Sequence, residues 1–141
     1  MWSKTYRQRV KGVSPEHLWN VWIDVNYWAA WQDDLEFARL EGAFEVGNTF
    51  LLRPKGGPTV TIKIIRAEKG VNFTDLTKFP LAEMIGEHDF IVHGDELEIK
   101  VTMSVRGPLA FLWSRVVAQG IVDDLPHQTQ CLIERAQKLA S

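Results

Sequence analysis

The stretch ELEIKVTMSVRGPLAFLWSRVV, residues 96–117, contains the change of pattern that decides the fold. In its first half, apolar residues alternate with charged or small polar residues, and the apolar set is Leu97, Ile99, Val101, Met103 and Val105. This two-residue period predicts a strand with one buried face and one wet face. After Gly107-Pro108 the apolar residues take helical spacing, which predicts a long helix from about residue 109 to 140. Gly120 and Pro126 are expected to bend or loosen that helix midway.

Turn signals divide the chain before this stretch into short extended segments. They lie at 55–58, 69–70, 80–83 and 94–95. Residues 2–11 predict a first strand, and two short helices are expected to follow it, capped by Ser14 and Asp24. The order predicts an α+β helix-grip fold in a single domain spanning 1–141, in which a curved antiparallel sheet of about seven strands wraps on the long C-terminal helix and two short helices follow strand 1.

Three segments carry a resemblance to a known family: SPEHLWNVWIDVNYWAAWQ (14–32), LEGAFEVGNTF (40–50) and RGPLAFLWSRVV (106–117). In them the chain resembles the START-like (SRPBCC) superfamily, and within it the polyketide cyclase/dehydrase-like branch. Trp19 and Trp31 fall where such proteins often carry aromatic residues, and Gly47 falls at their usual turn glycine. The resemblance covers essentially the whole chain and includes no catalytic signature. It implies a helix-grip fold around a hydrophobic cavity that holds lipids, hormones or polyketides.

Composition restricts the classes of partner. The net charge is -2 and the basic residues are dispersed, which argues against a nucleic-acid backbone as partner. The single cysteine, Cys131, permits no intramolecular disulfide and no thiolate-rich metal site, and we expect neither a metal nor another cofactor. The chain shows no secretory signal and no stretch of membrane-spanning length. We therefore expect a cytoplasmic protein without stable membrane insertion, either a monomer or a weak homodimer.

The segment LWNVWIDVNYWAAW, residues 18–31, holds four of the six tryptophans. Trp19 and Trp22 lie three residues apart on the first short helix, and we expect them mainly to pack in the core. Trp28 and Trp31 lie nearer the expected mouth of the cavity, and for them packing and ligand contact both stay open. Indoles combine a broad apolar surface with one N–H donor, which suits a planar, partly polar ligand.

Turn lengths predict how the strands pair. With two-residue turns at 69–70 and 94–95, Ile64 faces Asp75 and Phe90 faces Ile99. A four-residue connection at 80–83 then places Asp75 opposite His88 on the concave face. In an apolar cavity the carboxylate favours an imidazolium while burial opposes it. Such a pair is a candidate general acid/base for an enolisable carbonyl, and a purely structural pair is the alternative.

The other titratable residues form no catalytic pattern. His93 lies an odd number of residues from His88 and so points to the opposite face, which removes the obvious metal pair. The adjacent pairs Asp33-Asp34 and Asp123-Asp124 diverge, and we interpret them as caps or surface residues. His127 is interpreted as an exposed helical residue.

The predicted site combines two candidate catalytic residues, His88 and Asp75, with an apolar wall. The residues predicted to contact a ligand are Trp28, Trp31, Ile62, Ile64, Phe73, Thr77, Phe90, Val101, Met103, Trp113 and Val117. Binding or transport of a small hydrophobic molecule of lipid, polyketide or aromatic type is the favoured function, because it requires only a cavity. A cyclase/dehydratase-type enzyme without a metal is the first alternative. A protein-interaction module that resembles Hsp90-activator domains is the second.

Overall fold

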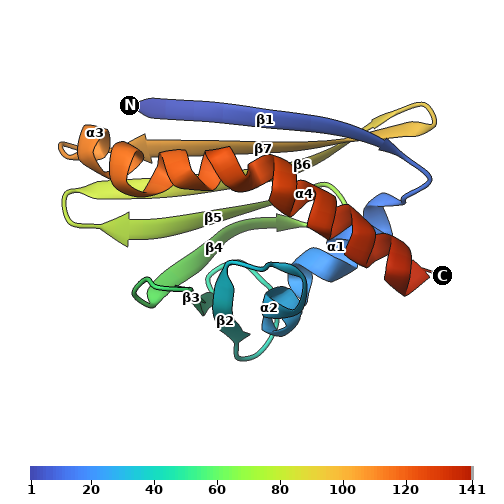
Figure 1. Ribbon diagram of the computed structural model, residues 1–141, viewed down its shortest axis with the longest axis horizontal. Helices are drawn as coiled ribbons and strands as arrows, with labels where there is room; N and C mark the ends of the chain where they lie inside the picture. Colours follow the sequence, from blue (N-terminus) through green and yellow to red (C-terminus); the bar gives the residue numbers. More distant parts are fainter. Residues whose placement is uncertain (141) are drawn as a thin grey trace.

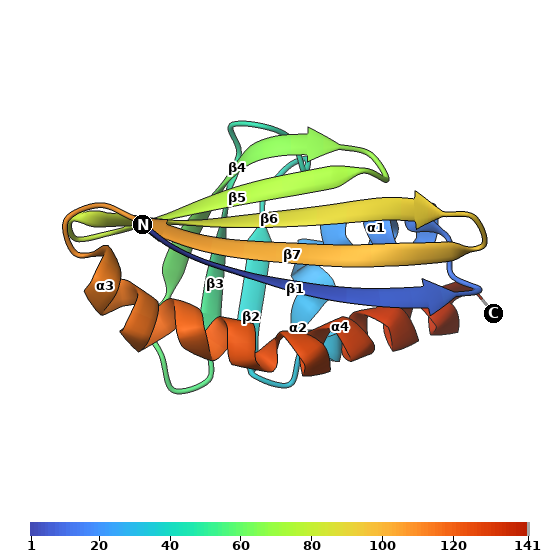
Figure 2. The same ribbon diagram turned by 90° about the horizontal axis from the view of Figure 1, so that it is seen from above.

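The computed structural model describes residues 1–140, in which one antiparallel sheet curves around a long terminal helix (Figures 1 and 2). Its seven strands have the order β1-β7-β6-β5-β4-β3-β2. They are β1 (Trp2–Lys11), β2 (Leu35–Leu40), β3 (Thr49–Pro54), β4 (Val60–Glu68), β5 (Asn72–Phe79), β6 (Ala82–His93) and β7 (Glu96–Arg106). The α+β helix-grip prediction is therefore confirmed.

Two short helical segments connect β1 to β2. Helix α1 (Pro15–Ile23) begins as predicted, because the Ser14 side chain accepts a 3.1 Å hydrogen bond from the backbone N–H of His17. A 3₁₀ turn, η1 (Val25–Tyr27), and a single α-turn, α2 (Trp28–Trp31), follow it. The predicted cap at Asp24 is wrong in detail, because its side chain forms no capping hydrogen bond.

The terminal helix runs without a break through α3 (Ala110–Trp113), the π turn η2 (Ser114–Ala118) and α4 (Gln119–Ala140). It lies across the concave side of the sheet (Figure 1). The departure from α geometry is the π turn, whereas Pro126 lies inside α4. Such wide turns occur frequently at functional sites. Within residues 1–140, no helix has both the length and the apolar character needed to cross a membrane.

Two of the three predicted strand registers are confirmed. Phe90 pairs with Ile99 between β6 and β7, and Ile64 pairs with Asp75 between β4 and β5. The second pairing arises differently from the prediction. The β4–β5 turn is one residue longer than expected, since Glu68 pairs with Asn72, and a bulge between Ile64 and Arg66 restores the expected register.

The predicted β5–β6 register is wrong by two residues. Phe79 pairs with Ala82, so the connection is the two-residue turn 80–81 rather than a four-residue loop. Leu81 takes a positive φ of 57° there, and its carbonyl accepts a 3.0 Å hydrogen bond from Leu109 at the start of the terminal helix. Trp113 Nε1 donates to the carbonyl of Pro80 at 2.9 Å. Tertiary contacts thus hold a two-residue turn where the sequence signals a longer connection.

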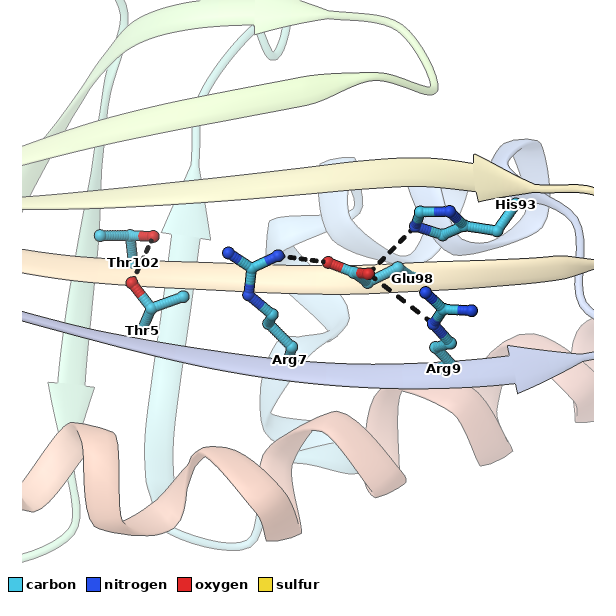
Figure 3. Close-up of polar contacts among 6 residues, drawn as sticks. All are labelled: Thr5, Arg7, Arg9, His93, Glu98 and Thr102. Atoms are coloured by element: carbon cyan, nitrogen blue, oxygen red, sulfur yellow. Dashed lines mark hydrogen bonds and ion pairs between the residues drawn. The ribbon is translucent and has the colours of Figure 1, made fainter.

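The convex face of the sheet is polar, as the alternation in β7 predicts. On this face Glu98 accepts hydrogen bonds from Arg7 at 3.1 Å and from His93 at 3.0 Å (Figure 3). Arg9 lies 3.8 Å from the same carboxylate. His93 therefore points away from His88, as its odd spacing indicates.

Candidate ligand-binding cavity

A cavity of about 620 Å³ lies between the concave face of the sheet, the segment around α2 and the terminal helix. This volume falls within the range of small-molecule sites, roughly 300–1,000 Å³. Strands β2 to β7 contribute side chains to its wall, and aromatic rings and aliphatic groups make up most of the lining. The sheet and the helix do not close on each other completely, which leaves room for a guest molecule.

Most of the predicted ligand contacts line this cavity. They are Trp28, Trp31, Ile62, Phe73, Thr77, Val101, Met103, Trp113 and Val117, together with Asp75 and His88. Ile64 and Phe90 do not line it, although both belong to the concave face. Ile64 is fully buried, and Phe90 stacks on Trp22 with ring centroids 4.6 Å apart. These two residues lie where the short helices cover the sheet, so they belong to the core.

Trp22 was expected in the core but also lines the cavity. Its indole meets the ring of Phe73 edge-on at 4.8 Å and that of His88 at 5.1 Å. Its neighbour Trp28 donates from Nε1 to the Trp22 carbonyl at 3.0 Å. The indole N–H of Trp31 is buried and has no hydrogen-bond partner among the described residues. The tryptophan segment therefore forms part of the cavity wall as well as its cover.

A polar rim of the cavity was missed from the sequence. Asp34 and Asp124 both contribute to the lining, with Gln128, whereas the expectation placed them on caps or on the surface. Burial raises the pKa of Asp34, the charge of Asp124 raises it further, and a hydrogen bond from Gln128 acts in the opposite direction. Helical spacing offered a signal, because Asp124 and Gln128 share a helix face with Val117.

Asp75 and His88 lie diagonally across β5 and β6 rather than directly opposite each other. Asp75 pairs with Gly86, and His88 pairs with Phe73. A shift of two residues keeps every side chain on the same face, so both groups still point into the cavity. His88 Nδ1 lies 3.9 Å from Asp75 Oδ2, which is too long for a hydrogen bond.

Gly86 makes room for this pair. A Cβ atom on residue 86 would lie 3.0 Å from Asp75 Oδ1 and 3.2 Å from His88 Cε1, closer than ordinary contacts allow. The imidazole stacks on Phe73 with centroids 3.9 Å apart and an interplanar angle of 9°. Its Nδ1 is buried without a hydrogen-bond partner within the described chain. The aromatic contacts, and not an ion pair, hold the imidazole in place.

Burial decides the charges of these two groups. It raises the pKa of Asp75 to about 7, although a backbone hydrogen bond at Gly86 acts in the opposite direction. It lowers the pKa of His88 to about 4, against opposing contributions from the Phe73 backbone and the charge of Asp89. Of the two opposed effects expected from the sequence, desolvation therefore outweighs attraction. At pH 5–6 the pair is a carboxylic acid beside a neutral imidazole.

A cluster outside the cavity offers donor atoms that metals bind. His127 Nε2 lies 2.8 Å from Asp33 Oδ2 and 3.6 Å from Cys131 Sγ. It is the one group of three such residues that converges within the described part of the chain. Hydrogen bonding to Asp33 raises the pKa of His127. The side chains of His127 and Asp33 are both more than half exposed, so a surface ion pair between them accounts for this arrangement.

Comparisons of sequence give no relatives. No protein-family model matches the chain, and no curated protein sequence matches it.

Comparisons of structure identify the fold. The protein TTHA0849 from Thermus thermophilus superposes with a TM-score of 0.75 at 11% identity, covering 99% of this chain and 100% of the other. A START superfamily protein from Mycobacterium smegmatis gives 0.72 at 12% identity over 97% and 98%. Norcoclaurine synthase from Thalictrum flavum, in complex with dopamine and hydroxybenzaldehyde, gives 0.67 at 13% identity over 99% and 87%. The chain therefore has the helix-grip fold that these proteins share, the START superfamily protein among them, as its sequence predicted.

Proposed function

We propose that this protein binds a small, mostly apolar molecule in its cavity. The observation that carries the proposal is the space of about 620 Å³ whose wall includes four indoles and several aliphatic side chains. Ligand sites of this kind combine an apolar wall with a few polar groups that fix orientation. By analogy of fold, the norcoclaurine synthase complex with two small aromatic molecules supports a guest of similar class.

Tryptophan fluorescence tests this function directly, because Trp22, Trp28, Trp31 and Trp113 line the cavity. We expect quenching or a spectral shift when lipids, polyketides and small aromatic molecules are titrated. We also expect native mass spectrometry to find a bound molecule in protein purified from its own host. If neither signal appears across the panel, the proposal is wrong.

A matched pair of variants separates binding in the cavity from adsorption to the surface. Val117→Phe adds volume inside the cavity and is expected to weaken binding at least about tenfold. Val92→Phe makes the same change at a residue that is 66% exposed and does not line the cavity. The affinity of this variant for the ligand is expected to equal that of the parent protein.

An enzyme with acid/base chemistry is the second candidate, and the pKa of Asp75 favours it. A carboxyl group with a pKa of about 7 can both accept and donate a proton at neutral pH. Placed beside a carbonyl compound, Asp75 could take a proton from the carbon next to the carbonyl and return it to oxygen. The neutral imidazole of His88 would then orient the oxygen.

Turnover and affinity distinguish this enzyme from a pure carrier. Asp75→Asn is expected to abolish turnover of a bound carbonyl compound, while the affinity of the protein for that compound changes little. Thr77→Val alters a cavity-lining residue on the same face of β5 and serves as the matched control. Equal activity of Asp75→Asn and the parent protein would exclude Asp75 as a catalytic residue.

A further inference from the structure

Apart from His88, every ionisable side chain of the described cavity wall is a carboxyl group. Among the described residues, Asp34, Asp75 and Asp124 line it, and no lysine or arginine does. The chain as a whole has 16 basic and 18 acidic residues, so overall composition does not account for this bias. His88 contributes no compensating charge, because burial lowers its pKa to about 4. The wall therefore repels an anionic ligand and attracts a cationic one.

Two of the three carboxylates lie where the cavity wall reaches solvent. Asp34 follows α2 and is exposed, whereas Asp124 is half-buried on α4. They lie close enough for the charge of Asp124 to raise the pKa of Asp34, an effect second only to burial. Like charges at one opening repel each other, and a cation placed between them removes that repulsion. We name Asp34 and Asp124 the acidic rim.

The wall beneath the acidic rim is suited to an apolar body. Trp28, Trp31 and Trp113 supply broad aromatic surface, and aromatic faces also attract cations. Deep burial of a charge is costly, so a cationic group is best placed at the rim, where water still reaches it. Further inside, burial keeps Asp75 largely protonated below pH 7, and it offers a hydrogen bond rather than a counter-charge.

We propose that the ligand is an amphipathic amine, with an apolar or aromatic body inside the cavity and an ammonium group at the acidic rim. This inference rests on the proposed binding function and names its ligand class. A fatty-acid anion is excluded by the same geometry, because its carboxylate would face acidic groups without any lysine or arginine of the described wall to pair with.

A series of probes with one body and three head groups tests the proposal: 4-phenylbutylamine, 4-phenylbutanol and 4-phenylbutanoic acid. We expect the amine to bind about tenfold more tightly than the alcohol at low ionic strength, and the acid to bind most weakly. The preference for the amine should shrink as salt is added, because the rim is open to solvent. Equal affinity of amine and alcohol would overturn the amine proposal and leave the binding function intact. Failure of all three probes would also overturn the amine proposal, and the wider panel of lipids and polyketides would then decide the binding function.

Variants at the acidic rim locate the ammonium group. The double variant Asp34→Asn, Asp124→Asn should lose the tenfold preference for the amine and keep its affinity for the alcohol, which also reports that the cavity is intact. The double variant Asp33→Asn, Asp123→Asn is the matched control, because it removes the same charge from neighbouring residues that do not line the cavity. If the first variant keeps the preference, or if the control loses it equally, the assignment is wrong.

Discussion

Two carboxylate–imidazole pairs lie on opposite faces of the same sheet, and strand β6 supplies both histidines. On the concave face, His88 Nδ1 lies 3.9 Å from Asp75. On the convex face, His93 Nε2 lies 3.0 Å from Glu98 (Figure 3). The chemical groups are the same in the two pairs, so any difference between them comes from the surroundings.

The surroundings differ in cations and in water. Desolvation raises the pKa of Glu98, but hydrogen bonds from His93 and Arg7 and the charge of Arg7 outweigh it, and the net shift is downward. Asp75 has aromatic neighbours, and burial raises its pKa to about 7. Glu98 is therefore stabilised as a carboxylate by hydrogen bonds from His93 and Arg7. Burial disfavours the charged forms of both groups of the concave pair, which suits the binding of an apolar body that we propose.

The concave pair also moves a proton on folding. Between pH 4 and 6.5 the unfolded chain has an Asp75 carboxylate and a His88 imidazolium, whereas the folded chain has a carboxylic acid and a neutral imidazole. Both states bind one proton at these two groups. Folding stability depends on pH only where the two states bind different numbers of protons. The contributions of the pair therefore cancel over this range.

Single substitutions should break the cancellation in opposite directions, and this is the largest effect that we expect. Asp75→Asn leaves His88 alone, with a folded pKa of about 4 below its ordinary 6.5, so the unfolded state binds more protons and stability rises with pH over that range. His88→Phe keeps the aromatic ring and leaves Asp75, whose pKa is raised from 3.8 to about 7, so stability falls as pH rises through that range. In each variant the free energy of unfolding should change by roughly 3–4 kcal/mol across this pH range.

Urea unfolding at a series of pH values measures both slopes. The double variant, which lacks both groups, should regain the flat profile of the parent protein over pH 4–6.5. Slopes of the same sign in the two single variants would show that the pair does not exchange its proton on folding.

Gly86 provides a second way to disturb the concave pair. In Gly86→Ala the added Cβ would lie 3.0 Å from Asp75 Oδ1, so the pair must move apart. We expect a loss of about 1–3 kcal/mol in the free energy of unfolding, as for other overpacked sites. Glu87→Ala, at the exposed neighbour on the convex face, is the control and should change stability by less than about 0.5 kcal/mol. Equal stability of the two variants would contradict the steric role of Gly86.

The side on which each residue lies could be predicted from sequence, because the two-residue period of strands fixes it. Asp75 and His88 were placed on the concave face, and His93 on the convex face, for this reason. The partner of Asp75 on β6 could not be predicted. It depends on the turn at 80–81, where Leu81 takes φ 57° without a glycine or asparagine to signal it.

The acidic rim could be predicted only in part, because helical spacing offers a signal for Asp124 but the two members come from distant parts of the chain. Asp34 and Asp124 each stand next to another aspartate that does not line the cavity, namely Asp33 and Asp123. Sequence shows the adjacent pairs and not the pair that forms across the opening. Which member of each pair faces the cavity depends on how the terminal helix is rotated against the α2–β2 connection.

Glu98→Gln tests the convex side of the comparison and should have the smallest effect. Because folding lowers the pKa of Glu98 from its ordinary 4.5, its contribution to stability is present above that pH and disappears as pH falls. The variant should therefore melt below the parent protein at pH 7, and the difference should shrink as pH falls below 4.5. High salt should also reduce the difference at pH 7, because Arg7 and His93 are open to solvent. A difference that does not change as pH falls would indicate lost packing instead. The slopes of the concave variants arise from burial and should resist salt, which separates the two faces in one experiment.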